Sequence, residues 1–282
     1  MIDAVRAEAL KMARHRGTWL MVWIYPIGVA LIVVGTLIYT MFAGASDEAP
    51  GSAAQWIRDT TLFWHAPGSG PGRILLASFT ALVFAGEYGW NTWKLVVPSS
   101  RRSELIAAKW LIVIAFTLMA LTATQIVTFV GIGIEAAQGT RIPDDVTFGA
   151  VMTAQVRAAA YSLVPIIYAV SFAGMFAVLT RSILATVVLS IALVIVESSL
   201  PLLGLFFYAR APGLTEFLIQ ATPPFHVENL TEWAFYERPY SLVLSLERAL
   251  ETGWGTSLAI VLGWSALAAV VTLASFKRQD MN

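Results

Sequence analysis

Residues 87–109, with the sequence EYGWNTWKLVVPSSRRSELIAAK, decide how the chain folds. They form a long polar and basic stretch between two strongly apolar segments. A basic stretch in this position is typical of a cytoplasmic connection between two membrane-spanning helices. Its interpretation therefore depends on whether the flanking apolar segments cross a membrane.

The composition indicates a membrane protein. Hydrophobic residues make up 57% of the chain and charged residues only 13%, whereas about a quarter of a soluble domain is charged. The mean hydropathy is +0.71. The net charge of zero gives no support to nucleic-acid binding. The absence of cysteine excludes disulfides, thiolate metal sites and a cysteine nucleophile.

Six apolar segments are long enough to cross a bilayer, whose core of roughly 30 Å requires about 20 helical residues. They are residues 19–44, 74–94, 110–134, 158–180, 182–209 and 252–276. Backbone groups in lipid must be satisfied within the segment, so each should be a helix. The sequence therefore predicts an all-α integral membrane protein, with one six-helix transmembrane domain over residues 19–282.

The distribution of lysine and arginine predicts that both termini are cytoplasmic. Eleven of the 18 basic residues would then lie inside and seven outside. The outside segments include a large loop at residues 210–251. Residues 1–18 are predicted to form an interfacial helix. The alternative is a basic segment that only anchors the chain ahead of the first span. The apolar run that follows is too long for a signal peptide, whose apolar region has about 7–15 residues.

Two acidic residues fall within predicted spans. Only 13 residues precede Glu87 in the second span, about 20 Å of helix, so this helix must continue beyond it. Asn91 and Lys94 would then share a polar face with Glu87, and the alternative is a carboxylate at the headgroup level. Glu197 lies roughly 22 Å beyond the turn before the fifth span. Glu197 is a candidate functional residue. The alternatives are that it forms a hydrogen bond to a neighbouring helix, or that the span ends early and leaves it at the outer surface.

A separate cytoplasmic helix is predicted over residues 95–109. Pro98 ends or redirects the preceding helix, and the two serines after it are good N-caps for a new one. The third span would then start at residue 110. Positively charged residues near phospholipid are the simpler interpretation, but that interpretation leaves the bend unexplained. The charged residues of the segment are Arg101, Arg102, Glu104 and Lys109.

The sequence lacks the motifs of several kinds of chemistry. It contains no P-loop, no His-Glu-x-x-His pair and no Gly-x-Ser-x-Gly motif. Its histidines, His15, His65 and His226, lie far apart in the sequence. We therefore expect no catalytic residue, no metal site and no cofactor bound by this chain.

The end of the predicted second span resembles the permease subunits of ABC-2-type transporters. The pattern is Glu-Tyr-x-x-Asn-Thr-x-Lys-x-x-x-x-Pro-Ser-Ser-Arg, followed by Ala-Lys before the third span. The family usually has glycine at the position of Asn91. The prolines at residues 223 and 224 also look like the family's last outside loop. The matching residues are Glu87, Tyr88, Asn91, Thr92, Lys94, Pro98, Arg101 and Lys109.

The resemblance implies a function. Such a permease pairs with a second copy or a homologue in the bacterial inner membrane, and with separate subunits that bind ATP and magnesium. It is not an enzyme by itself, and transport is usually outward. The interfacial helix and the helix after Pro98 would contact the ATP-binding subunit, through Pro98, Arg101, Arg102, Glu104 and Lys109. The translocation path would include Glu87, Tyr88, Asn91 and Glu197.

Two other hypotheses stay open. The first is a proton-coupled secondary transporter that uses Glu87 and Glu197 as relay acids, although no inverted repeat with paired broken helices is evident. The second is an intramembrane enzyme or an assembly factor, which would require a compact set of polar residues around one cavity.

Overall fold

The computed structural model describes residues 1–43, 51–89, 101–245 and 248–279. Helices make up 85% of the structure, which confirms the predicted helical class. The only strands in these ranges are β1 (Leu242–Ser245) and β2 (Arg248–Leu250), which pair antiparallel. They form a small hairpin that the all-α prediction did not include.

The helices follow one another in the order α1 (Ile2–Arg14), α2 (Arg16–Ala43), α3 (Ala53–Thr60), the short 3₁₀ helix η1 (Leu62–Gly68), α4 (Gly70–Gly89), α6 (Arg102–Ala137), α7 (Phe148–Thr180), α8 (Ile183–Tyr208), α9 (Pro212–Ala221), α10 (Pro223–Tyr236) and α11 (Trp254–Arg278). In the described residues, five of these helices are long and apolar enough to cross a membrane, namely α2, α6, α7, α8 and α11. The chain is therefore a multi-pass helical membrane protein.

Helix α4 covers most of the predicted second span but is not one of those five. Its 20 residues include two charged ones, Arg73 and Glu87, which lower its apolar character. Residues 90–94 of the predicted span, including Asn91, lie outside the described residues, and so does Pro98. A sixth span therefore stays a prediction.

Helix α6 differs from the expected pair of separate helices. It runs without interruption from Arg102 to Ala137, so its first two turns belong to the same helix as the predicted third span. No proline or glycine occurs between Arg102 and Trp110, and nothing there breaks the backbone hydrogen bonds of the helix. The predicted boundary at residue 110 is therefore absent in the structure.

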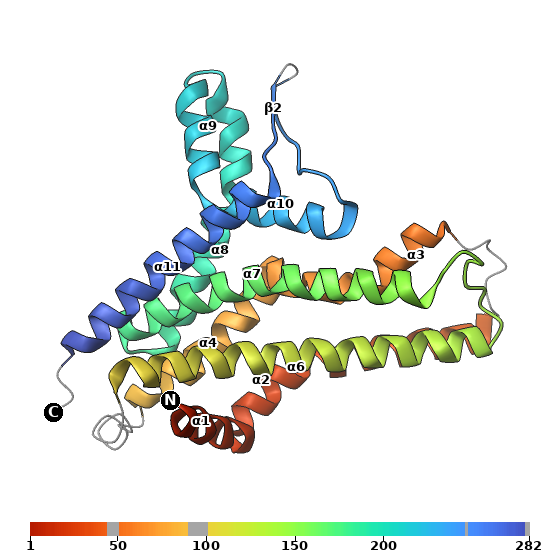
Figure 1. Ribbon diagram of the computed structural model, residues 1–282, viewed down its shortest axis with the longest axis horizontal. Helices are drawn as coiled ribbons and strands as arrows, with labels where there is room; N and C mark the ends of the chain where they lie inside the picture. Colours follow the sequence, from red (N-terminus) through yellow and green to blue (C-terminus); the bar gives the residue numbers. More distant parts are fainter. Residues whose placement is uncertain (44–50, 90–100, 246–247, 280–282) are drawn as a thin grey trace.

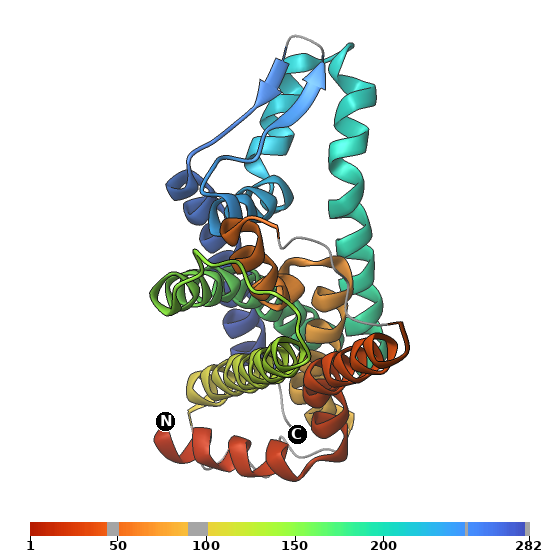
Figure 2. The same cartoon turned by 90° about the vertical axis from the view of Figure 1, so that its right-hand side faces the viewer.

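Helix α7 lies at the centre of the molecule. It packs against α4, α8, α10 and α11, while α2 packs along α6. Figure 1 shows α6 and α7 from the side, with their axes nearly aligned. Figure 2 shows α8 at a steep angle to both. The 36 residues of α6 and 33 of α7 give lengths of about 54 and 50 Å. Both exceed the roughly 30 Å of a hydrocarbon core, so both must extend beyond it.

The predicted loop at residues 210–251 is a folded unit. Pro212 and Pro223 occupy the first turns of α9 and α10, where proline fits because its missing amide needs no partner. Leu242 and Leu244 alternate with exposed residues along β1, and their side chains pack with those of α9 and α10. This unit lies at the opposite end of the molecule from α1 (Figure 2).

Candidate functional site

Four charged side chains from three helices meet beneath α1, and we name them the α1 cluster. The ammonium nitrogen of Lys109 on α6 lies 2.8 Å from Glu87 Oε1 on α4 and 3.0 Å from Glu8 Oε1 on α1. Lys11 of α1 also pairs with Glu87. Lys109, Glu87 and Glu8 are buried, with at most 5% of any residue exposed.

The charges of the α1 cluster balance. Two carboxylates, Glu8 and Glu87, face two ammonium groups, Lys11 and Lys109. The ammonium group of Lys109 also donates a hydrogen bond to the carbonyl oxygen of Val83, at 3.0 Å. With the two carboxylates, each of its three hydrogens therefore has an acceptor. Because a buried charge is costly unless it is paired, these contacts hold the ends of α1, α4 and α6 together.

A second buried set of polar groups joins α4, α7 and α8, and we name it the α8 cluster. Arg73 pairs with one carboxylate oxygen of Glu197, and the hydroxyl of Tyr168 donates a hydrogen bond to the other. All three residues are buried. Arg73 precedes Glu87 by 14 positions, so the two clusters lie about 21 Å apart along α4.

A cavity of about 240 Å³ adjoins the α8 cluster. Arg73 and Glu197 line it together with Glu228 and Tyr240. The pKa of Glu228 is raised, chiefly because the protein removes water from its carboxylate. Arg73 opposes this shift, and the like charge of Glu232 adds to it. The cavity is small and combines charged groups with apolar walls, which suits water molecules or a small cationic group.

The residues predicted to contact an ATP-binding subunit do not all lie on a surface. Arg101 is exposed, and Glu104 is partly exposed and pairs with the amino group of Met1. Lys109 is buried in the α1 cluster, which does not suit a direct contact with a partner. Its position about two turns into a continuous helix, beneath α1, explains the difference.

Arg102 contacts another part of the chain. Its guanidinium donates hydrogen bonds to the carbonyl oxygens of Phe276, Lys277 and Gln279, at 3.1, 2.8 and 2.9 Å. These groups lie at the end of α11, where carbonyls lack helical partners and a cation is favourable. The predicted path residue Tyr88 belongs here too, since its hydroxyl donates to Gln279 Oε1 at 2.7 Å.

A serine and a histidine lie together in α10 and α11 but do not form a catalytic pair. His226 Nε2 lies 2.7 Å from the Gln220 carbonyl oxygen, so this nitrogen carries the proton, and Nδ1 accepts from Ser257 at 2.9 Å. Burial lowers the pKa of His226, which favours its neutral form. Ser257 is fully buried, so no substrate reaches it. In the described ranges no three His, Cys, Asp or Glu side chains are placed to hold a metal.

Sequence reasoning identified Glu87, Lys109 and Glu197 but not their partners. It missed Glu8, Lys11, Arg73 and Tyr168 as members of buried sites. One signal was available, because each acidic residue within an apolar segment requires a counter-charge. Choosing that counter-charge among the many basic residues needs the packing of the helices.

No known family model matches the chain, and no curated protein matches it. The functional interpretation therefore depends on the sequence pattern and on the geometry of the two clusters.

Proposed function

We propose that the chain is the permease subunit of an ATP-driven exporter of the ABC-2 type. In this proposal six helices cross the bacterial inner membrane, both termini are cytoplasmic, and α1 lies in the membrane interface. Two permease subunits, identical or homologous, enclose the translocation path. Separate ATP-binding subunits bind ATP and magnesium and carry out hydrolysis.

The observation that carries the proposal is the pairing of α1 with two long helices through the α1 cluster. Glu8 and Lys11 of α1 contact Lys109 of α6 and Glu87 of α4. Separating these charges within the protein would leave them without partners, at a cost of about 3–5 kcal/mol for each broken pair. A push on α1 would therefore move the ends of α4 and α6 as one rigid body.

The surface near this cluster supports a contact with a partner. Arg101 is exposed just ahead of α6, and Glu104 lies on its first turn. A subunit that contacts these residues would act on the same end of α6 that holds Lys109. Force on this surface would reach the α1 cluster through less than two turns of helix, since Glu104 and Lys109 are five residues apart.

A proton-coupled transporter is the alternative, with Glu87 and Glu197 as relay acids. Both carboxylates form ion pairs with basic side chains, so a proton-driven cycle would have to break such a pair at every turnover. Transport by that mechanism would collapse with the proton gradient and survive ATP depletion. The ABC proposal gives the opposite result in both conditions.

The test is the composition of the complex in native membranes. The tagged chain, solubilised in a mild detergent, should retain a subunit with a P-loop, at about one copy per permease copy. The control is the same purification with the surface reversal Arg101→Glu and Glu104→Lys, which should lose that subunit while the permease still inserts. Repeated isolation of the chain without any ATP-binding subunit would contradict the proposal.

A further inference from the structure

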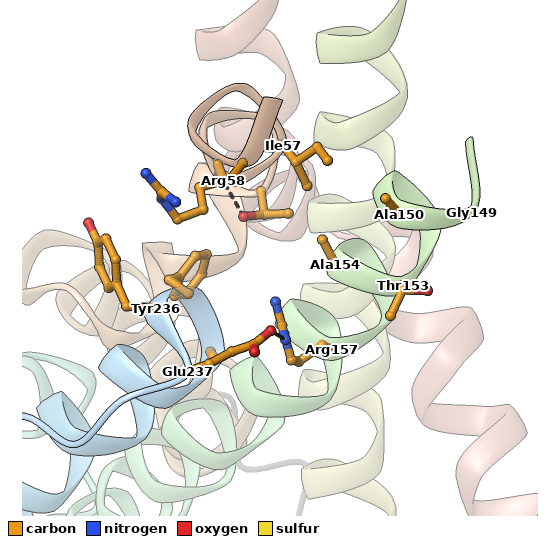
Figure 3. Close-up of a pocket in the computed structure, with 13 residues that line it drawn as sticks. Ile57, Arg58, Gly149, Ala150, Thr153, Ala154, Arg157, Tyr236 and Glu237 are labelled. Carbon is orange, nitrogen blue, oxygen red and sulfur yellow. Dashed lines mark hydrogen bonds and ion pairs between the residues drawn. The ribbon is translucent and has the colours of Figure 1, made fainter. Parts of the chain in front are cut away.

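A pocket lies away from both clusters, between α3, the start of α7 and the end of α10. Its volume is about 550 Å³. Figure 3 shows Arg58 and Tyr236 on one side of the hollow, with Arg157 and Glu237 along another. Residues of α7 form the remaining wall. Three separate parts of the chain therefore contribute to one site.

Small side chains on one face of α7 create the hollow. Gly149, Ala150, Thr153 and Ala154 follow the helical repeat, and each contributes little volume to the wall. A Cβ atom added to Gly149 would meet nothing within 4 Å. The wall is apolar apart from Thr153, so the pocket offers contact area for hydrocarbon as well as for polar groups.

Buried hydrogen bonds fix the position of α3 against α7. Trp64 donates from Nε1 to Gln155 Oε1 at 2.8 Å, and Gln155 Nε2 donates to the carbonyl oxygen of Thr60 at 3.1 Å. Both contacts lie directly behind the pocket, on residues next to Thr61 and Ala154 of its lining. The hollow is therefore preformed, which lowers the entropic cost of binding.

The pocket carries an excess of positive charge. Its charged lining residues are Arg58, Arg157 and Glu237. Two cations against one anion give a net charge of +1. Arg157 pairs with Glu237, but its Nε is buried and has no hydrogen-bond partner within the described residues. Because no acceptor of the described residues bonds this donor, an acceptor from a ligand would satisfy it.

Arg58 is held by an aromatic contact. Its guanidinium carbon lies 5.4 Å from the centre of the Tyr236 ring, and that of Arg238 lies 5.2 Å from the same ring. A guanidinium group that lies over an aromatic face can still donate hydrogen bonds from its N–H groups, which point outward in its own plane. Arg238 also pairs with Glu232 at 3.3 Å, so the positive charge that this contact holds at the pocket is that of Arg58.

The backbone of Glu237 is strained where it meets Arg157. Its φ angle is 55°, in the left-handed region at the end of α10. A residue with a side chain adopts this conformation at a cost of roughly 1–2 kcal/mol, which glycine would avoid. Such strain often occurs at ligand sites. Here it places a carboxylate beside Arg157, where a bound anion would compete with it.

An exposed apolar stripe lies beside the pocket on α7. Phe148, Met152 and Val156 are 81%, 42% and 65% exposed, at successive spacings of four residues. They are one position away from the residues that line the hollow. Because α7 is longer than a hydrocarbon core, its first turns fall near the headgroup layer. A chain bound at the arginines would continue along this stripe.

We infer that this pocket binds the phosphate headgroup of an anionic phospholipid, with an acyl chain on the stripe of Phe148, Met152 and Val156. Arg58 and Arg157 contact the phosphate, since planar guanidinium groups match its geometry. The site does not depend on the proposed transport function, because neither the α1 cluster nor the α8 cluster contributes to it. Bound lipid would fasten α3 and α10 to the start of α7.

Native mass spectrometry tests this inference on the purified full chain after exchange from mixed phosphatidylcholine and phosphatidylglycerol. We expect one phosphatidylglycerol molecule to be retained per chain. The Arg58→Ala, Arg157→Ala double variant should lower this retention by at least about tenfold, as expected from the loss of charge-assisted hydrogen bonds. The matched control Arg141→Ala removes an exposed arginine before α7 that does not line the pocket and should change nothing.

Two further variants separate binding from folding. Thr153→Trp fills the hollow from an exposed position and should abolish retention without disturbing the core. Glu237→Gln removes the competing carboxylate and should raise retention severalfold, whereas a merely structural ion pair would give no increase. Retention that is equal for phosphatidylcholine, or unchanged in the arginine and tryptophan variants, would overturn the inference. Displacement of the lipid by millimolar inorganic phosphate would instead assign the site to free anions.

Discussion

The ammonium nitrogen of Lys109 lies 2.8 Å from Glu87 and 3.0 Å from Glu8, and so joins two helices to a third. These residues are far apart in the sequence, at 22 and 101 positions. The side chain of Lys109 therefore contacts both α1 and α4 from α6, and the Lys11–Glu87 pair adds a second link between α1 and α4. The stability and the coupling of this end of the protein should both depend on these contacts.

Replacement of Lys109 by methionine should destabilise the protein. The change keeps most of the length of the side chain but removes one of the two ammonium groups that the described residues place against Glu8 and Glu87. We expect the free energy of unfolding to fall by about 3–5 kcal/mol, measured by denaturant unfolding in detergent. Lys277→Met, at an exposed position near the end of α11, is the matched control. A loss no larger than that of the control would show that the cluster does not hold the helices.

The hydroxyl of Tyr168 should contribute to the α8 cluster through its bond to Glu197. Tyr168→Phe removes this donor and keeps the ring, and should cost about 1.5–3 kcal/mol of unfolding free energy, as for a hydrogen bond to a charged group. In the Glu197→Gln background the same change should cost clearly less, because the charge is gone. Equal costs in the two backgrounds would mean that the hydroxyl and the carboxylate act independently.

Arg102 should hold the end of α11 in place. The Arg102→Ala variant leaves the carbonyl oxygens of residues 276, 277 and 279 without their guanidinium partner. We expect faster hydrogen exchange of the amides in the last turn of α11 and unchanged exchange in α7. Arg101→Ala serves as the control because its side chain is exposed. Unchanged exchange at the end of α11 would contradict the assignment.

Acidification should destabilise the protein through His65, which is partly buried, and His226, which is buried. Burial lowers the pKa of His65 from 6.5 to about 4, and lowers that of His226 as well. The unfolded chain then binds protons more readily than the folded one, so stability falls as the pH drops from about 6.5 to about 4. Thermal unfolding across this range should show the decline. The double variant His65→Gln, His226→Gln should lose most of the slope, and an equally steep slope would exclude these residues as the cause.

Hydropathy predicts the long helices because the signal is local. A run of apolar residues such as 254–276 determines a spanning helix by its length alone, whatever its neighbours. Helix α6 continues through the predicted boundary at residue 110, because no proline or glycine there breaks it. The helices and the hairpin within residues 210–251 were also not predicted, because the apolar segments there are short and interrupted.

The partners of the buried charges required the packed structure. Glu87 was expected to share a polar face with Asn91 and Lys94 on its own helix, and both of these lie outside the described residues. In the structure it contacts Lys109 and Lys11, on other helices. Sequence spacing reports neighbours within one helix, and it says nothing of contacts that the fold creates between distant segments.

ATP hydrolysis by the purified complex tests the central claim most directly. The chain alone should show no ATPase activity, and the complex with its ATP-binding subunit should hydrolyse ATP. The surface reversal Arg101→Glu, Glu104→Lys should leave the added ATP-binding subunit with only its uncoupled basal rate, while Arg278→Glu, an exposed change at the end of α11, should not. Hydrolysis that is the same with and without the permease, and the same with both variants, would contradict the claim that this chain is an ABC permease subunit.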